Sequence, residues 1–151
     1  MSLISKILTP ECVLLDSESA SKKRVFERVG LLFENTQNIA RSLVFDSLFA
    51  REKLGSTGLG QGVAIPHGRV KGLRDAVAAF VKMQNPIPFD APDGLLVNFI
   101  FVLLVPERAT DLHLQILGEL AQMFSDQKFR DQLQQTDDPA AIHKLFTDWK
   151  S

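Results

Sequence analysis

The sequence is short of cysteine, of basic clusters and of long apolar runs, and each shortage excludes a class of protein. Cys12 is the only cysteine among 151 residues, which excludes an internal disulfide framework and favours a reducing, cytoplasmic compartment. Lysine and arginine number 17 against 18 acidic residues, and no basic run is longer than residues 22–24. We therefore expect neither nucleic acid nor an anionic membrane as a partner.

Membrane insertion is also not expected. The most apolar stretch, from Leu95 to Val105, is too short to span a bilayer and contains Asn98. The amino terminus lacks the uninterrupted apolar segment of a signal peptide. With 45% hydrophobic and 23% charged residues, the chain has the composition of an ordinary globular protein. At this length we expect a single domain over residues 1–151, located in the cytoplasm.

What the sequence does have is a glycine-rich stretch from Arg51 to Arg69, which is R-E-K-L-G-S-T-G-L-G-Q-G-V-A-I-P-H-G-R. Residues 63–65 are apolar, and Pro66 favours an extended conformation in the residue before it. We therefore predict a short strand that ends just before His67, with Gly68 easing the turn that follows. Because ligands collect at the carboxyl ends of strands in open α/β sheets, His67 is a candidate for handling an anion.

The glycines of this stretch do not match a nucleotide-binding fingerprint. In a dinucleotide motif they would lie between a strand and a helix, whereas here they precede the strand. The nucleotide P-loop needs Gly-Lys followed by Ser or Thr, a triplet that the sequence does not contain. Two interpretations remain. Either a phosphate is held by His67, glycine backbone and the hydroxyls of Ser56 and Thr57, or a plain turn lies beside an incidental histidine.

Strands and helices alternate around this stretch, which predicts an α/β fold. We predict further strands at 12–15, 75–83 and 95–105, of which the last is almost continuously apolar and therefore buried on both faces. Capped helices are predicted at about 20–34 after Ser19, 39–54 after Asn38, and 111–124 after Thr110.

The remaining segments are predicted from turn and cap chemistry. Residues 86–94 (P-I-P-F-D-A-P-D-G) form an edge strand or a loop, in which Asp90 and Asp93 are explained by the turn. Asp138 and Pro139 begin a last helix, on which we expect His143 to face solvent.

Two further residues are candidates for assisting His67. Arg51 lies in the last turn of its helix, near the glycine-rich loop, where its guanidinium would face a phosphoryl oxygen. The helix macrodipole also favours a cation there, although Lys53 in the same turn supplies one. His113 is the third residue of its helix, at the electropositive end where backbone N–H groups favour an anion. A histidine on an apolar face is also a common core residue, so this role depends on His67.

The glycine-rich stretch, P-I-P-F-D-A-P-D-G, and F-V-L-L-V-P-E followed by T-D-L-H-L together resemble the enzyme IIA family of the bacterial phosphotransferase system. The similarity is to the mannitol/fructose branch and, within it, to the nitrogen-regulatory type, and it covers nearly the whole chain. It implies a single mixed β-sheet flanked by helices on both faces. Arg51, Ser56, Thr57, His67 and His113 all fit the pattern of the family.

The resemblance also implies a function. His67 would accept a phosphoryl group from an HPr-like phosphocarrier protein, supported by His113 and Arg51 and without a cofactor or metal. The nitrogen-regulatory type implies a regulator whose phosphorylation state controls target proteins such as transporters or kinases. The alternative is a fructose- or mannitol-specific component that passes the phosphoryl group to a IIB protein. A hydrolytic metal site at the two histidines lacks a convincing third ligand.

Overall fold

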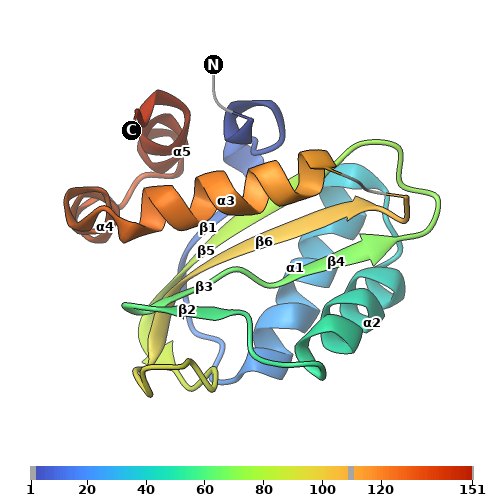
Figure 1. Ribbon diagram of the computed structural model, residues 1–151, viewed down its shortest axis with the longest axis horizontal. Coiled ribbons are helices and arrows are strands. Elements are labelled where there is room, and N and C mark those ends of the chain that lie inside the picture. The colour runs from blue at the N-terminus through green and yellow to red at the C-terminus, as the bar shows by residue number, and fades with distance from the viewer. Residues whose placement is uncertain (1–2, 109–110, 151) are drawn as a thin grey trace.

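In the computed structural model, six strands form one mixed β-sheet that lies between helices (Figure 1). The structure describes residues 3–108 and 111–150. The strands are β1 (Val13–Ser17), β2 (Gly58–Gly60), β3 (Val63–Ala64), β4 (His67–Val70), β5 (Val77–Ile87) and β6 (Val97–Pro106). Their order is β1-β5-β6-β3-β2, and β4 pairs with β6 as well.

The helices of the described residues cover both faces of this sheet. Two short 3-10 turns, η1 (Ile4–Lys6) and η2 (Pro10–Cys12), come before α1 (Lys22–Gln37), α2 (Arg41–Glu52), α3 (Asp111–Ser125), α4 (Gln127–Gln135) and α5 (Pro139–Asp148). In Figure 1, α3, α4 and α5 lie together on one side of the sheet and α1 and α2 on the other. The predicted fold class, a mixed sheet flanked by helices on both faces, is confirmed. No helix in the described ranges is long and apolar enough to cross a membrane.

The centre of the sheet is β6, as its nearly continuous apolar sequence predicts. Every residue from Phe99 to Val105 is at most 3% exposed. β5 runs antiparallel along one edge of β6, and β3 and β4 run parallel along the other. A strand that is paired on both edges and covered on both faces fixes the two layers of helices relative to each other.

Two of the predicted helix caps are wrong. Ser21, rather than Ser19, caps α1, because its side chain accepts a hydrogen bond from the Arg24 N–H. Asn38 ends α1 instead of starting α2: its φ is 57°, and its N–H donates to the carbonyl oxygen of Phe33. Asparagine tolerates this left-handed conformation, which commonly closes a helix. The sequence pattern alone does not say which side of Asn38 is helical.

Other local predictions have mixed outcomes. Asp138 caps α5 as expected, through a hydrogen bond from the Ala141 N–H. Asp93 serves the predicted turn, in which its carboxylate accepts hydrogen bonds from the N–H groups of residues 61 and 95. The prediction for His143 is wrong, because its Nε2 lies 2.7 Å from the carbonyl oxygen of Leu8 and is partly buried. The predicted cap at Thr110 lies outside the described residues.

Candidate functional site

His67 lies where one edge of the sheet is interrupted. β3 ends at Ala64 and β4 begins at His67, and both run parallel to β6 in consecutive register. Between them, the carbonyl oxygen of Pro66 accepts a hydrogen bond from the Leu103 N–H. The predicted strand before His67 is therefore correct in place, but the expected turn after it is wrong, because the chain continues as β4.

Gly68 has a different role from the one predicted. A Cβ atom added at this position would lie 3.0 Å from the backbone carbonyl of Ser47 and closer still to its side chain. Glycine is therefore needed because α2 packs directly against β4, and this close approach brings the end of α2 to the side of His67.

One ring nitrogen of His67 is bound within the protein. Nδ1 lies 2.8 Å from the carbonyl oxygen of Ile65. A carbonyl oxygen only accepts, so Nδ1 holds the proton and the neutral ring has its free lone pair on Nε2. Burial lowers the pKa of His67 below its ordinary value of 6.5; the Ile65 bond opposes this shift, while the Arg51 and His113 charges add to it. The ring is therefore neutral at neutral pH and can act as a nucleophile.

His113 is brought beside His67 by the first turn of α3. The two ring centroids are 5.7 Å apart, and the rings are inclined by 51°. Burial, followed by the charge of Arg69, lowers the pKa of His113. Its Nε2 is buried and has no hydrogen-bond partner among the described residues. Buried polar atoms are normally paired, so this unpartnered nitrogen is unusual, and His113 also lines a pocket together with His67.

A pocket of about 400 Å³ opens between α2, β4 and α3. Both histidines line it, together with Arg51 and Arg69. Arg51 comes from the last turn of α2, and its Nη1 donates to the carbonyl oxygen of Gly55 at 2.9 Å. The structure thus brings together His67, His113 and Arg51, the three residues that the sequence analysis singled out.

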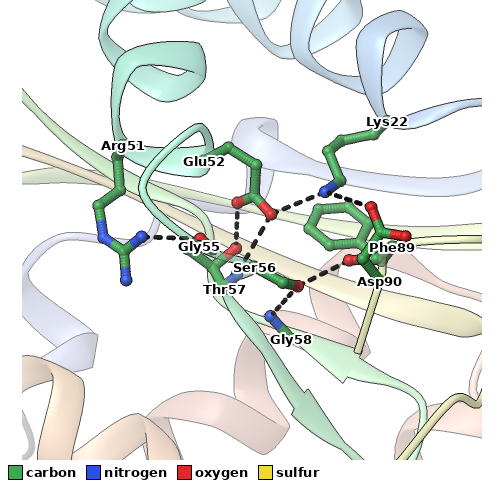
Figure 2. A network of polar contacts seen from close by, with 9 residues as sticks. All are labelled: Lys22, Arg51, Glu52, Gly55, Ser56, Thr57, Gly58, Phe89 and Asp90. Carbon is green, nitrogen blue, oxygen red and sulfur yellow. Dashed lines mark hydrogen bonds and ion pairs between the residues drawn. The ribbon is translucent and has the colours of Figure 1, made fainter. Parts of the chain in front are cut away.

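Ser56 and Thr57 are not among the residues that line this pocket. Figure 2 shows both in hydrogen bonds with residues around the loop. Ser56 Oγ donates to the carbonyl oxygen of Phe89 at 2.6 Å and accepts a hydrogen bond from the Gly58 N–H. Thr57 is only 4% exposed, and its Oγ1 donates to a carboxylate oxygen of Glu52 at 2.7 Å. Both hydroxyls therefore stabilise the loop before β2, whereas the phosphate-binding prediction placed them on a ligand.

Sequence reasoning missed Glu52 and its partner Lys22. Glu52 ends α2, where the helix macrodipole disfavours an acidic side chain, and this was the one local signal that the position is unusual. Its side chain is 4% exposed and lies 2.8 Å from Lys22 Nζ. Nothing in the spacing of the chain indicates that the first residue of α1 meets the last residue of α2.

The pocket lacks the ligands of a metal centre. Within the described residues, no group of three or more histidine, cysteine, aspartate or glutamate side chains is arranged to hold a metal ion. The chemistry that these residues support is attack by the Nε2 lone pair of His67 on a group whose anionic oxygens are bound by the Arg51 guanidinium.

Comparisons with known proteins agree on a family. The sequence model described as "Phosphoenolpyruvate-dependent sugar phosphotransferase system, EIIA 2" matches residues 6–149. The nitrogen regulatory protein of Pseudomonas aeruginosa is 40% identical over 149 residues, which cover 98% of this chain and 97% of that protein.

Solved structures agree with this match. The nitrogen regulatory protein IIA-Ntr from Neisseria meningitidis has a TM-score of 0.91 and 50% identity, and the match covers 95% of this chain and 99% of that one. The mannitol IIA protein of Escherichia coli has a TM-score of 0.77 at 19% identity, covering 91% and 96% of the two chains, and this likeness concerns the fold alone.

Proposed function

The chain belongs to the EIIA type 2 family of the phosphoenolpyruvate-dependent sugar phosphotransferase system, and from this premise we propose that His67 accepts a phosphoryl group from an HPr-type phosphohistidine carrier. One observation carries the proposal most directly. A neutral His67, fixed through Nδ1, lines the same pocket as His113, whose buried Nε2 has no partner among the described residues.

Nε2 of His67 is the attacking atom. Its lone pair forms the new bond to phosphorus while the bond between phosphorus and the imidazole of the carrier breaks, and the carrier recovers a neutral ring. His67 gains positive charge in this step, and its Nδ1–H bond to the Ile65 carbonyl oxygen stabilises that charge. No proton has to move, so the requirement is a well-oriented ring rather than a general base.

His113 and Arg51 stabilise the phosphoryl oxygens. Burial lowers the pKa of His113 and keeps its ring neutral, and in the tautomer protonated at Nε2 this nitrogen donates one hydrogen bond. The Arg51 guanidinium has N–H donors beyond the one bound to Gly55, and its positive charge offsets the charge that develops on the phosphoryl group. Positioning and charge stabilisation suffice for this transfer, so we propose no metal or cofactor.

The output of the phosphorylation is regulatory in this proposal. Two relatives that cover nearly the whole chain are named nitrogen regulatory proteins, at 40% and 50% identity. Phosphorylation adds a charge of about −1.5 to −2 beside Arg51 and Arg69, so the surface around the pocket changes its charge balance. Target proteins such as transporters or kinases would distinguish the two forms.

The phosphorylation site is tested with phosphoenolpyruvate, enzyme I and an HPr-type carrier. Wild-type protein should gain a label that is labile in acid and stable in alkali, and His67→Ala should gain none. His143→Gln is the matched control, because this histidine lies outside the pocket, and it should label normally. A label retained by His67→Ala refutes the site. His113→Ala and Arg51→Ala should stay folded by circular dichroism but accept the phosphoryl group more slowly.

The regulatory output is tested against the sugar-specific alternative in a second experiment. Wild-type and His67→Ala proteins are used to capture partners from a lysate, in parallel with transfer assays to fructose and mannitol IIB proteins. We expect partners that bind one phosphorylation form and no efficient transfer to IIB. Efficient transfer without a form-dependent partner would instead establish the sugar-transport function.

A further inference from the structure

A partly buried ion pair lies next to the pocket, at the contact between α1 and α2. Glu52 Oε2 and Lys22 Nζ are 2.8 Å apart, and their side chains are 4% and 19% exposed. Lys22 Nζ also lies 3.7 Å from the exposed carboxylate of Asp90 and 4.5 Å from the ring centre of Phe89. Burying a carboxylate at the carboxyl end of a helix is unfavourable in itself. The role of Glu52 therefore depends on the other groups that its carboxylate contacts.

The Glu52 carboxylate uses both of its oxygens to hold Thr57 (Figure 2). Oε1 accepts a hydrogen bond from Thr57 Oγ1 at 2.7 Å. Oε2 accepts one from the Thr57 N–H at 3.2 Å, in addition to the bond from Lys22. Thr57 is therefore fixed through its backbone and its side chain by a single anion.

A series of hydrogen bonds continues from Thr57 to the ring of His67. The carbonyl oxygen of Thr57 accepts a bond from the Ile65 N–H at 3.0 Å. The carbonyl oxygen of Ile65 in turn accepts the bond from His67 Nδ1 at 2.8 Å. The carbonyl oxygen of Ile65 determines which ring nitrogen of His67 holds the proton. The N–H of the same residue is bonded to Thr57, which Glu52 holds.

The same loop also holds Arg51. Its guanidinium donates to the carbonyl oxygen of Gly55, two residues before Thr57. A displacement of this loop would therefore move the arginine and the acceptor of the His67 Nδ1–H together. Both groups act on the phosphoryl transfer proposed above.

We propose that Glu52, held in place by Lys22, is a positioning residue that fixes the Nδ1–H tautomer of His67 and the place of the Arg51 guanidinium. The kinetic part of this inference rests on the proposed function. The tautomer part does not, because the ring of His67 can be observed in the unphosphorylated protein.

The first test is Glu52→Gln, which keeps the shape of the side chain but replaces one acceptor oxygen with a donor. ¹⁵N NMR of the unphosphorylated protein should show one dominant His67 tautomer, protonated at Nδ1, in the wild type and a mixture of tautomers in the variant. The rate constant of phosphoryl acceptance at saturating carrier should fall about tenfold, because small misplacements cost transfer rate steeply. The KM for the carrier should stay within about twofold, because Glu52 itself does not line the pocket.

Two matched variants separate positioning from a general loss of stability. Glu34→Gln removes the exposed pair between Glu34 and Arg41, which also joins α1 to the start of α2, and should change neither the tautomer nor the rate. Lys22→Arg preserves the ion pair and should retain the wild-type rate, whereas Lys22→Met should slow acceptance as Glu52→Gln does. If Glu52→Gln does not fold, Thr57→Val removes the hydroxyl bond alone and should shift the tautomer in the same direction.

The possible outcomes are distinguishable. A lowered unfolding temperature in Glu52→Gln with an unchanged tautomer and an unchanged rate constant would overturn the inference and leave Glu52 with a purely structural role. Failure of the wild type to label at His67 would instead overturn the proposed function. A tautomer change in Glu52→Gln would still establish the positioning of His67 in that case.

Discussion

Lys22 and Lys82 are both largely removed from solvent, but their ammonium groups contact different kinds of partner. Lys22 pairs with a carboxylate that is itself 4% exposed, that of Glu52. Lys82 is 4% exposed and donates to the backbone carbonyl oxygens of Gln134 and Thr136, at 2.8 and 3.0 Å. Its only charged partner in the described residues is Asp137, which is 73% exposed.

The difference lies in what the partners contact next. The contacts of Lys82 satisfy carbonyl groups at the end of α4 and fasten that helix against β5, which is a structural role. The contacts of Lys22 continue through Glu52 and Thr57 to the residues that hold His67 and Arg51. A buried charge is therefore not in itself a sign of function, and the groups bonded to its partner decide between the two roles.

Removing Lys22 should have the largest effect on stability. Lys22→Met leaves the Glu52 carboxylate buried without its cation, which should lower the free energy of unfolding by about 3 kcal/mol. Adding Glu52→Gln removes the unpaired charge, so the double variant should recover at least about 1 kcal/mol. Urea unfolding of the wild type, the two single variants and the double variant measures this coupling. A double variant that is as unstable as the sum of the two single changes would show that the ions do not interact.

Removing Lys82 should have a somewhat smaller effect, confined to stability. Lys82→Met leaves two helix-end carbonyls without their donor and should lower the free energy of unfolding by about 2 kcal/mol. The rate of phosphoryl acceptance at His67 should not change. Asp137→Asn is the control. Because that carboxylate is exposed, its loss should lower the free energy of unfolding by less than about 0.5 kcal/mol. A slowed transfer in Lys82→Met would remove the distinction between the two lysines.

Ser56→Ala should have a smaller effect again, and it tests the role that the sequence suggested for this hydroxyl. Loss of the bond to the Phe89 carbonyl oxygen should lower the free energy of unfolding by about 1 kcal/mol. Transfer to His67 should slow by less than about threefold, because the hydroxyl stabilises the loop. If the hydroxyl contacted the phosphoryl group in the transition state, its removal would instead slow the transfer about a hundredfold.

The smallest expected effect is the dependence of stability on pH. Burial lowers the pKa of His67 and of His113, so below pH 6.5 the unfolded chain binds protons more readily than the folded protein does. The contribution of the two neutral rings to the free energy of unfolding is therefore complete above pH 6.5. It is lost as the pH falls from there through the lowered folded-state pKa values of the two histidines.

Urea unfolding between about pH 7.5 and 5.5 measures this dependence. The loss of stability on acidification should be smaller in a His67→Asn/His113→Asn variant and unchanged in Lys82→Met. An undiminished loss in the histidine variant would place the responsible groups outside the pocket.

Much of the architecture was determined by the sequence itself. Apolar continuity identified β6 as the buried central strand, and helical spacing located the helices to within a few residues. Asp138 was correctly assigned as a cap, since this role depends only on its own segment. The candidates His67, Arg51 and His113 were also named from their segments alone, because each stands at the end of a predicted strand or helix.

Only the tertiary structure decided how these residues meet. It showed that β3 and β4 run along the same edge of β6, which places the Ile65 carbonyl oxygen against the His67 ring. It also turned the Ser56 and Thr57 hydroxyls into the loop and joined Lys22 to Glu52 across 30 residues. Caps, turns and periodicity are properties of neighbouring residues, so a single sequence reveals them. A hydrogen bond between distant segments depends on the packing of the whole sheet, and no local pattern records it.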